Sequence, residues 1–91
     1  MLHRRFEEDG VVAGHFGRYG FHARLTQGPV SYGLNQHSLY KGHGRIAQLR
    51  IWQFDRSGAM VTLALYDRGW RFGRRQHLGV VRRLVEVLDG R

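Results

Sequence analysis

The hydrophobic pattern of the chain predicts two β-hairpins followed by one helix. Short β-type runs cover residues 11–16 and 19–26 and are separated by Gly17-Arg18, a pair suited to a tight turn. Apolar residues recur at every second position of the second run, which is the period of a strand with one buried face. We therefore expect these two runs to form the first hairpin.

Residues 45–54 and 59–66 form the clearest strand pair, because the segment 55–58 between them is a turn sequence with Gly58 available for positive φ. Alternation along both hairpins predicts that the helix covers one set of side chains, namely Tyr19, Phe21, Leu49, Ile51, Leu63 and Leu65. The opposite face then carries His22, Arg24, Gln48, Arg50, Trp52, Thr62 and, at its end, Tyr66.

A period of 3.6 residues predicts a C-terminal helix from Arg74 to Leu88. Its apolar stripe consists of Leu78, Val81, Leu84, Val85 and Leu88. Residues 1–91 are therefore interpreted as a single α+β domain, in which an antiparallel sheet of about four strands packs one face against the helix.

Two segments lie outside these elements. Residues 1–9 carry charges of both signs, and we expect them to be a loose N-terminal arm. Residues 27–44 are polar, contain several glycines and hold the only proline, Pro29. We expect a long loop there, and loops of such length are usually functional or mobile.

Composition indicates a folded domain. Apolar residues make up 42% of the 91 residues and aromatic residues 12%, which is enough for one modest core. The chain has no cysteine, which excludes a disulfide and a thiolate nucleophile. Its apolar runs are too short to span a membrane, and the N-terminus lacks an apolar signal core, which favours a cytoplasmic location.

Charge is the strongest compositional signal. Fifteen basic residues oppose seven acidic ones, the net charge is +8, and Lys41 is the single lysine among the arginines. Arginine binds phosphate and carboxylate bidentately and stacks on rings. A GC-rich genome can explain the preference for arginine over lysine, but it does not explain the net charge. The charge favours a polyanionic partner or an acidic protein surface.

Four segments follow one another in a distinctive order: Gly20-Phe21-x-Ala23-Arg24, Pro29-x-Ser31-Tyr32-Gly33-Leu34-Asn35, Gly44-Arg45-Ile46-x-x-Leu49 and Tyr66-Asp67-Arg68-Gly69-Trp70. This order resembles an uncharacterised family of short bacterial and phage proteins whose pattern reads Y-G-I-N-G-G-R-I-S-K-L and later Y-D-R-G-W. The resemblance covers residues 14–70, with residues 36–42 as an insertion and an unusually arginine-rich region after Trp70. It implies a single fold in a mobile element and carries over no catalytic residue.

The first candidate binding surface is the sheet face opposite the helix. Arg24, Arg50 and Trp52 are predicted to lie on it, and interleaved basic and aromatic groups are typical of surfaces that stack bases and neutralise phosphates. The alternative is that Trp52 and Phe54 lie beneath the long loop or in a homodimer interface, because exposed aromatic residues are often covered.

The second candidate surface follows the YDRGW element. Asp67 and Gly69 suit a turn between the last strand and the helix, and a carboxylate flanked by arginines is unsuited to general acid catalysis. Arg71, Arg74 and Arg75 then stand at the predicted start of the helix, where they form either an anion site or a merely solvated patch.

No residue pattern predicts a catalytic centre, a metal site or a cofactor. His37 and His43 flank the insertion and could meet, but their spacing matches no dense ligand motif. We therefore predict a small, non-enzymatic binding module of a phage or other mobile element that contacts nucleic acid or a nucleoprotein complex. The alternative is a protein-interaction module that docks on an acidic surface, such as an anti-CRISPR-like or anti-restriction-like inhibitor of a host defence complex.

Overall fold

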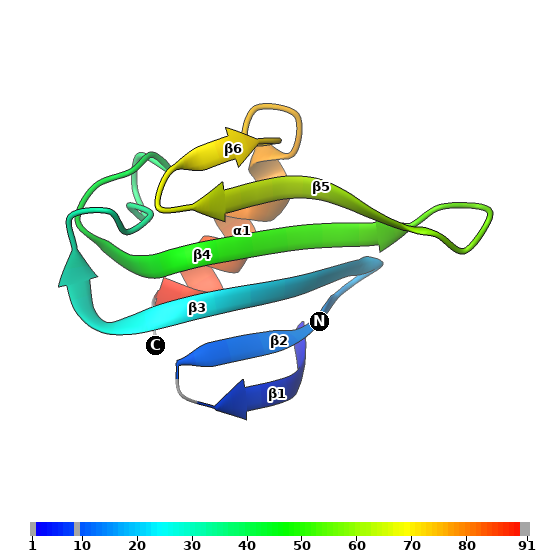
Figure 1. The fold of residues 1–91 in the computed structure, drawn as a ribbon, viewed down its shortest axis with the longest axis horizontal. Coiled ribbons are helices and arrows are strands. Elements are labelled where there is room, and N and C mark those ends of the chain that lie inside the picture. The colour runs from blue at the N-terminus through cyan, green and yellow to red at the C-terminus, as the bar shows by residue number, and fades with distance from the viewer. Residues whose placement is uncertain (1, 9, 90–91) are drawn as a thin grey trace.

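The computed structural model of the chain describes residues 2–8 and 10–89, with side chains for residues 10–89. The elements in this part of the chain are β1 (Leu2–Glu8), β2 (Val11–Phe16), β3 (Tyr19–Val30), β4 (Gly44–Phe54), β5 (Met60–Asp67), β6 (Trp70–Phe72) and α1 (Leu78–Asp89). The six strands form one antiparallel sheet in chain order, with the helix behind it (Figure 1). The predicted α+β class, with a single antiparallel sheet and a C-terminal helix, is confirmed.

The described sheet has six strands rather than about four because the segments at both of its edges also pair. Residues 2–8 form β1, which pairs with β2 from Leu2↔Phe16 to Glu8↔Val11. The prediction of a loose arm is therefore wrong for residues 2–8, and residues 1 and 9 lie outside the described residues. At the other edge, β6 pairs with β5 after a tight turn.

The long loop is shorter than predicted, since β3 continues to Val30, which pairs with Gly44. The loop consists of residues 31–43 rather than 27–44. Its residues Leu34 and Leu39 are fully buried in the main hydrophobic cluster. The loop therefore covers part of the core.

Asn35 shapes this loop through its side chain. Its Oδ1 accepts hydrogen bonds from the backbone N–H groups of His37 and Ser38, at 2.8 and 2.9 Å. The loop backbone also passes very close to the start of β4, where a β-carbon added at Gly33 or Gly44 would collide with the opposing backbone. These two glycines permit the close approach.

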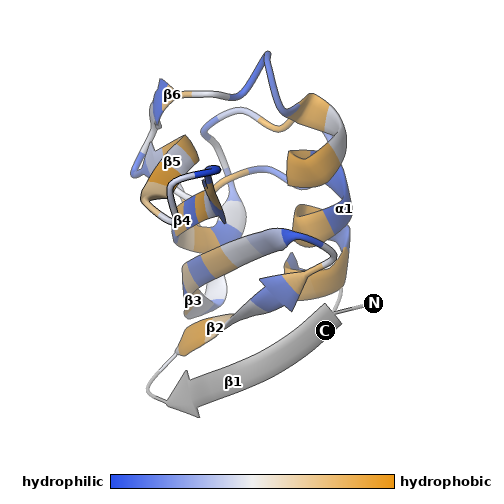
Figure 2. Ribbon diagram, turned by 90° about the vertical axis from the view of Figure 1, so that its right-hand side faces the viewer, coloured by the Kyte–Doolittle hydropathy of each residue, from blue (hydrophilic) through white to orange (hydrophobic). Residues whose placement is uncertain are grey.

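The core lies between one face of the sheet on one side and α1 with the loop on the other (Figure 2). The predicted apolar stripe of the helix packs inward, with Val81, Leu84, Val85 and Leu88 all buried. The helix begins at Leu78 rather than Arg74, because residues 74–77 form a turn ahead of it. None of the described residues forms a helix long and apolar enough to cross a bilayer.

A β-bulge in β5 overturns part of the predicted division between the two sheet faces. Ile51 pairs with Ala64, but the next residue, Trp52, pairs with Thr62, so that Leu63 is the extra residue of β5. The alternation of side chains is inverted beyond this point. Tyr66 consequently lies in the core and Leu65 on the opposite face, the reverse of the sequence prediction.

Tyr66 is the largest fully buried side chain and joins the loop to the sheet. Its hydroxyl donates a hydrogen bond of 2.7 Å to the carbonyl oxygen of Tyr32. Its ring meets that of Trp70 edge-on, with centroids 5.3 Å apart. Burial raises the pKa of the Tyr66 hydroxyl to about 12.

Replacing Tyr66 with phenylalanine should lower the free energy of unfolding by roughly 1–2 kcal/mol, because the carbonyl of Tyr32 loses its buried partner. The raised pKa adds a pH dependence: the contribution of Tyr66 is complete below pH 10.0 and is lost as the pH rises through about 12. The difference between wild type and Tyr66→Phe, measured by urea unfolding, should therefore shrink as the pH rises above 10.0.

Tyr40→Phe is the matched control, because Tyr40 is 57% exposed and the same atom is removed. It should leave the free energy of unfolding nearly unchanged. A stability difference between wild type and Tyr66→Phe that stays constant with pH would contradict the burial of the hydroxyl.

Candidate nucleic-acid interface

The sheet face opposite α1, here named the open face, carries three rows of side chains across β2 to β5 (Figure 2 shows α1 on the other side of the sheet). The strand register sets these rows as His15, Gly20, Trp52 and Thr62; Ala13, His22, Arg50 and Leu65; and Val11, Arg24, Gln48 and Asp67. Arg24, Arg50 and Trp52, which the sequence predicted to bind, stand in adjacent rows on this face. The structure therefore brings these three residues together.

Trp52 lies with its indole ring over Gly20 of the neighbouring strand. A β-carbon added at Gly20 would collide with atoms of this ring, so only glycine leaves room for it. Trp52 is half-buried and does not belong to the core cluster. One side of the ring thus packs on the sheet, and the indole remains partly open to solvent.

Arg50 is exposed beside this ring. Its Nε donates a hydrogen bond of 2.9 Å to Thr62 Oγ1. Its guanidinium carbon lies 5.9 Å from the centroid of the Trp52 ring, at the outer limit of a cation–π contact. These contacts fix the guanidinium next to the aromatic surface.

A shallow depression of about 180 Å³ adjoins Arg50 on the open face. The polar side chains that line it are His22, Gln48, Arg50 and Asp67. Gln48 Nε2 donates a hydrogen bond of 3.1 Å to Asp67 Oδ1 across the two strands. From the sequence, Asp67 is predicted only as a structural turn residue. The bulge in β5 puts Leu65 and Asp67 on the open face, and this bulge leaves no signal in the sequence.

The tip of the β4–β5 hairpin carries exposed apolar residues, and the hairpin extends past the neighbouring strands in Figure 1. Phe54 is 60% exposed and pairs with Met60, which is 47% exposed. Asp55 closes the turn, and hydrogen bonds from the Ser57 hydroxyl and the Ala59 N–H lower the pKa of its carboxyl. The hydrophobic pattern alone does not mark Phe54 or Met60 as site residues.

The long loop does not cover this aromatic surface. Its buried leucines pack in the core, on the α1 side of the sheet, whereas Trp52 and Phe54 follow the open face. The alternative that placed both aromatic residues beneath the loop is therefore wrong. A homodimer that buries them stays a prediction.

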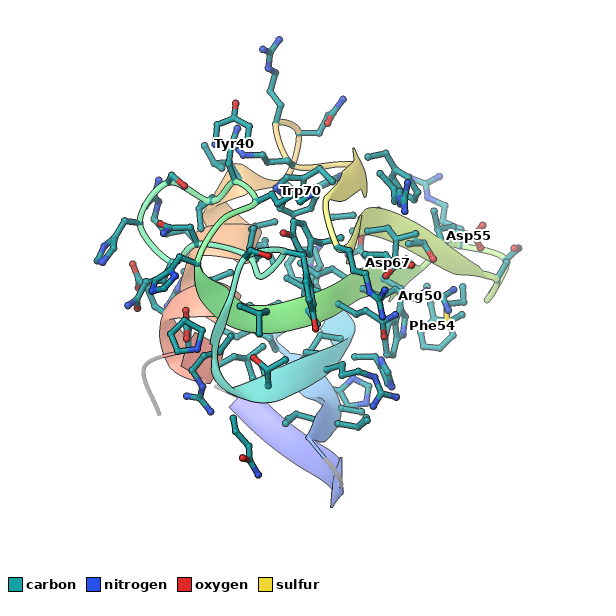
Figure 3. All side chains as sticks on the ribbon, turned by 60° about the vertical axis from the view of Figure 1, so that its left-hand side comes forward. Tyr40, Arg50, Phe54, Asp55, Asp67 and Trp70 are labelled. Carbon is teal, nitrogen blue, oxygen red and sulfur yellow. The ribbon has the colours of Figure 1, made fainter. Side chains whose placement is uncertain are left out.

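Arg74, predicted to bind an anion at the start of the helix, instead holds the loop. Its Nε donates to the carbonyl oxygen of Leu39 at 2.8 Å, and its Nη2 donates to that of Ser38 at 3.0 Å. Its guanidinium also stacks on the Tyr40 ring, 3.6 Å from the centroid. Figure 3 shows Tyr40 and Trp70 together, away from Arg50 and Phe54. Arg74 is therefore part of the fold.

Arg71 and Arg75 are exposed on either side of this contact. Arg71 Nη2 donates a hydrogen bond of 3.3 Å to the carbonyl oxygen of Asp67. Arg75 lies in the turn before α1 rather than in the first turn of the helix. The three predicted cations thus have different environments, since Arg74 is bound to the loop. Binding of an anion by Arg71 and Arg75 stays a prediction.

Asp67 and Gly69 do form a turn, but the turn joins β5 to β6 rather than a strand to the helix. The N–H of Asp67 donates to the carbonyl oxygen of Gly69 at 2.9 Å. Arg68 takes the left-handed conformation, with φ of 55°, and its guanidinium lies 5.3 Å from the Tyr32 ring centroid. The Asp67 carboxylate is left to bond with Gln48 on the open face.

The described arginines are not gathered on one side of the molecule. Arg24 and Arg50 lie on the open face, whereas Arg82 and Arg83 project from the exposed side of α1. Asp67 is the carboxylate of the open face as far as its side chains are described. The open face is distinguished by the combination of arginine with an aromatic ring.

Another hollow, of about 340 Å³, lies where the loop meets the end of α1. It is lined in part by His37, His43, Arg45 and Asp89. Burial raises the pKa of the Asp89 carboxyl, and Arg45 and His37 partly offset this effect. The two histidines that flank the insertion thus line one hollow, but no cluster of three metal-ligating side chains occurs among the described residues.

Comparison with protein-family models, with curated proteins and with solved structures finds no match to this chain. The resemblance to short bacterial and phage proteins stays a prediction.

Arg74→Lys should lower the free energy of unfolding by about 1–2 kcal/mol, because lysine cannot bond both loop carbonyls in the same planar geometry or stack in the same way on Tyr40. Arg75→Lys makes the same chemical change at an exposed position and should change stability by less than about 0.5 kcal/mol. Chemical unfolding of the two variants tests this, and equal effects would contradict a structural role for Arg74.

Proposed function

We propose that this chain is a small, non-enzymatic module that binds single-stranded nucleic acid on the open face. The observation that carries the proposal is the seating of Trp52 over Gly20, with Arg50 beside the ring and Arg24 one row further. This arrangement offers a stacking surface and cations at neighbouring positions. A single strand needs both, because its bases stack on the ring while its phosphates are neutralised by the cations.

Aromatic stacking favours a single strand over a duplex. The faces of bases in a duplex already stack on one another, whereas the bases of a single strand can splay onto a protein ring. Stacking of a base on an aromatic side chain contributes about 1–3 kcal/mol and tolerates any sequence. A sheet face with Trp52 in one row, and Phe54 two residues further along the same strand, fits this mode of binding.

Net charge supports the same partner. A protein with a net charge of +8 attracts polyanions over distances of about 10 Å at moderate salt. Because phosphate contacts release counterions, the affinity should fall as salt rises, with a slope of about −0.7 per contact for single strands. The resemblance to short bacterial and phage proteins is our reason for placing this activity in a phage or other mobile element.

Arg24→Glu should weaken binding of a labelled oligothymidylate several-fold and reduce the salt slope by about 0.7, since one phosphate contact is lost. Arg82→Glu makes the same charge change on the exposed side of α1 and should have a much smaller effect. Fluorescence anisotropy across a salt series measures both. Equal losses in the two variants would indicate non-specific attraction and contradict binding on the open face.

Trp52→Leu should weaken the same binding by about 1–3 kcal/mol, because leucine keeps apolar bulk but has no ring on which a base can stack. Trp52→Phe keeps a ring and should retain most of the affinity. Thermal unfolding of both variants shows whether the fold is kept. If leucine and phenylalanine give the same affinity in folded proteins, the stacking role of Trp52 is wrong.

A second candidate function is a protein-interaction module that docks on an acidic surface, such as that of a host defence complex. The exposed Phe54 and Met60 at the tip of the projecting hairpin favour it, because apolar side chains at a tip suit a protein contact. The two candidate functions predict different effects of nuclease on a partner that purifies with the protein. A stoichiometric protein partner that remains after nuclease treatment supports this second function.

A further inference from the structure

The depression on the open face is the hollow beside the proposed stacking surface. It lies in the rows next to Trp52 and is lined by His22, Gln48, Arg50, Leu65 and Asp67. Its volume of about 180 Å³ is below the usual range for a complete small-molecule ligand. It suits a single planar ring from a strand whose neighbouring base stacks on Trp52.

Several polar side chains that line this depression have hydrogen-bonding capacity that no described residue fills. Asp67 Oδ1 accepts one hydrogen bond, from Gln48 Nε2, although a carboxylate has room for about four. Gln48 has committed an N–H to this bond, so its carbonyl oxygen remains as an acceptor. Arg50 donates its Nε to Thr62, and its two Nη groups make no hydrogen bond to another described residue. The residues that line the depression therefore include two with unused acceptors, Asp67 and Gln48, and one with unused guanidinium donors, Arg50.

Guanine matches this set better than the other bases. Its N1–H and N2–H₂ groups form two parallel donors that suit a carboxylate, and its O6 and N7 atoms accept hydrogen bonds from a guanidinium. Adenine and cytosine present one exocyclic amine beside ring acceptors, so each can donate to the carboxylate only once. Thymine and uracil place carbonyl oxygens on both sides of a single N–H, and these oxygens repel a carboxylate.

We propose that Asp67 and Arg50 form a guanine-selective subsite, in which Asp67 accepts from N1–H and N2–H₂ and Arg50 donates to O6. The subsite rests on the proposed function, because it reads one base of a strand that Trp52 and Arg24 hold. Gln48 positions the carboxylate through its hydrogen bond. A well-placed bidentate contact discriminates between bases by roughly 5- to 150-fold.

The test uses labelled oligothymidylates of about ten nucleotides that differ only in one central base, which is guanine, adenine, cytosine or thymine. Wild-type protein should bind the guanine oligonucleotide roughly 5- to 150-fold more tightly than the all-thymine one. Inosine lacks the N2 amine and should lose most of this preference. A 7-deazaguanine keeps the N1, N2 and O6 edge, so it should retain the preference.

Asp67→Asn should abolish the preference for guanine, because an amide no longer offers two anionic acceptors. The affinity for the guanine oligonucleotide should fall far more than that for the all-thymine oligonucleotide, since thymine has no pair of N–H donors for the carboxylate. Disturbed folding would instead weaken all four oligonucleotides together. The inosine comparison with wild-type protein needs no variant, so it tests the subsite even if Asp67→Asn folds poorly.

The outcomes separate the two proposals. Equal affinity for the four central bases, with the all-thymine oligonucleotide still bound, overturns the guanine subsite and leaves the proposed function standing. A guanine preference that survives Asp67→Asn or inosine substitution also overturns the subsite. Failure of folded wild-type protein to bind any of the oligonucleotides overturns the proposed function itself.

Discussion

Packing of α1 and the loop against one face of the sheet is the constraint on which the rest of the structure depends. The helix has twelve residues and buries a single apolar stripe, and the loop contributes Leu34 and Leu39 to the same core. A domain of this size has material for one core only. Among the described residues, no second layer packs on the other sheet face.

The arginines divide between structural and exposed positions. Arg74 is built into the fold, since it bonds two loop carbonyls and stacks on Tyr40, whereas Arg24 stands exposed on the open face. A guanidinium can either hold backbone carbonyls within the fold or bind a partner at the surface, because it is planar, carries five donors and is weakly hydrated for its charge. Net charge alone therefore does not locate a binding surface, and the partner of each cation must be known.

The open face combines features that differ in cost and purpose. Gly20 contributes no side chain to the sheet, which weakens a strand. However, the Trp52 ring packs over Gly20, and a β-carbon at this position would collide with it. Asp67 places a negative charge on a surface proposed to attract phosphates, which is unfavourable unless the carboxylate reads a base. The proposed binding of an unstacked nucleobase accounts for both features, whereas general attraction of polyanions requires neither.

The sequence by itself determined the α+β class, both hairpins, the inward stripe of the helix and the placement of Arg24, Arg50 and Trp52 on one face, because these follow from hydrophobic periods that neighbouring residues set locally. It did not determine the pairing of β1, the burial of Leu39, the inverted face of Tyr66 and Leu65, or the structural role of Arg74. Those features depend on contacts between distant segments. A single bulge at Leu63 exchanges the two faces for the rest of β5. Arg74 donates a hydrogen bond to the carbonyl oxygen of Leu39, which is thirty-five residues away. Local sequence cannot encode such partners, since the free energy that selects them arises only when the segments pack.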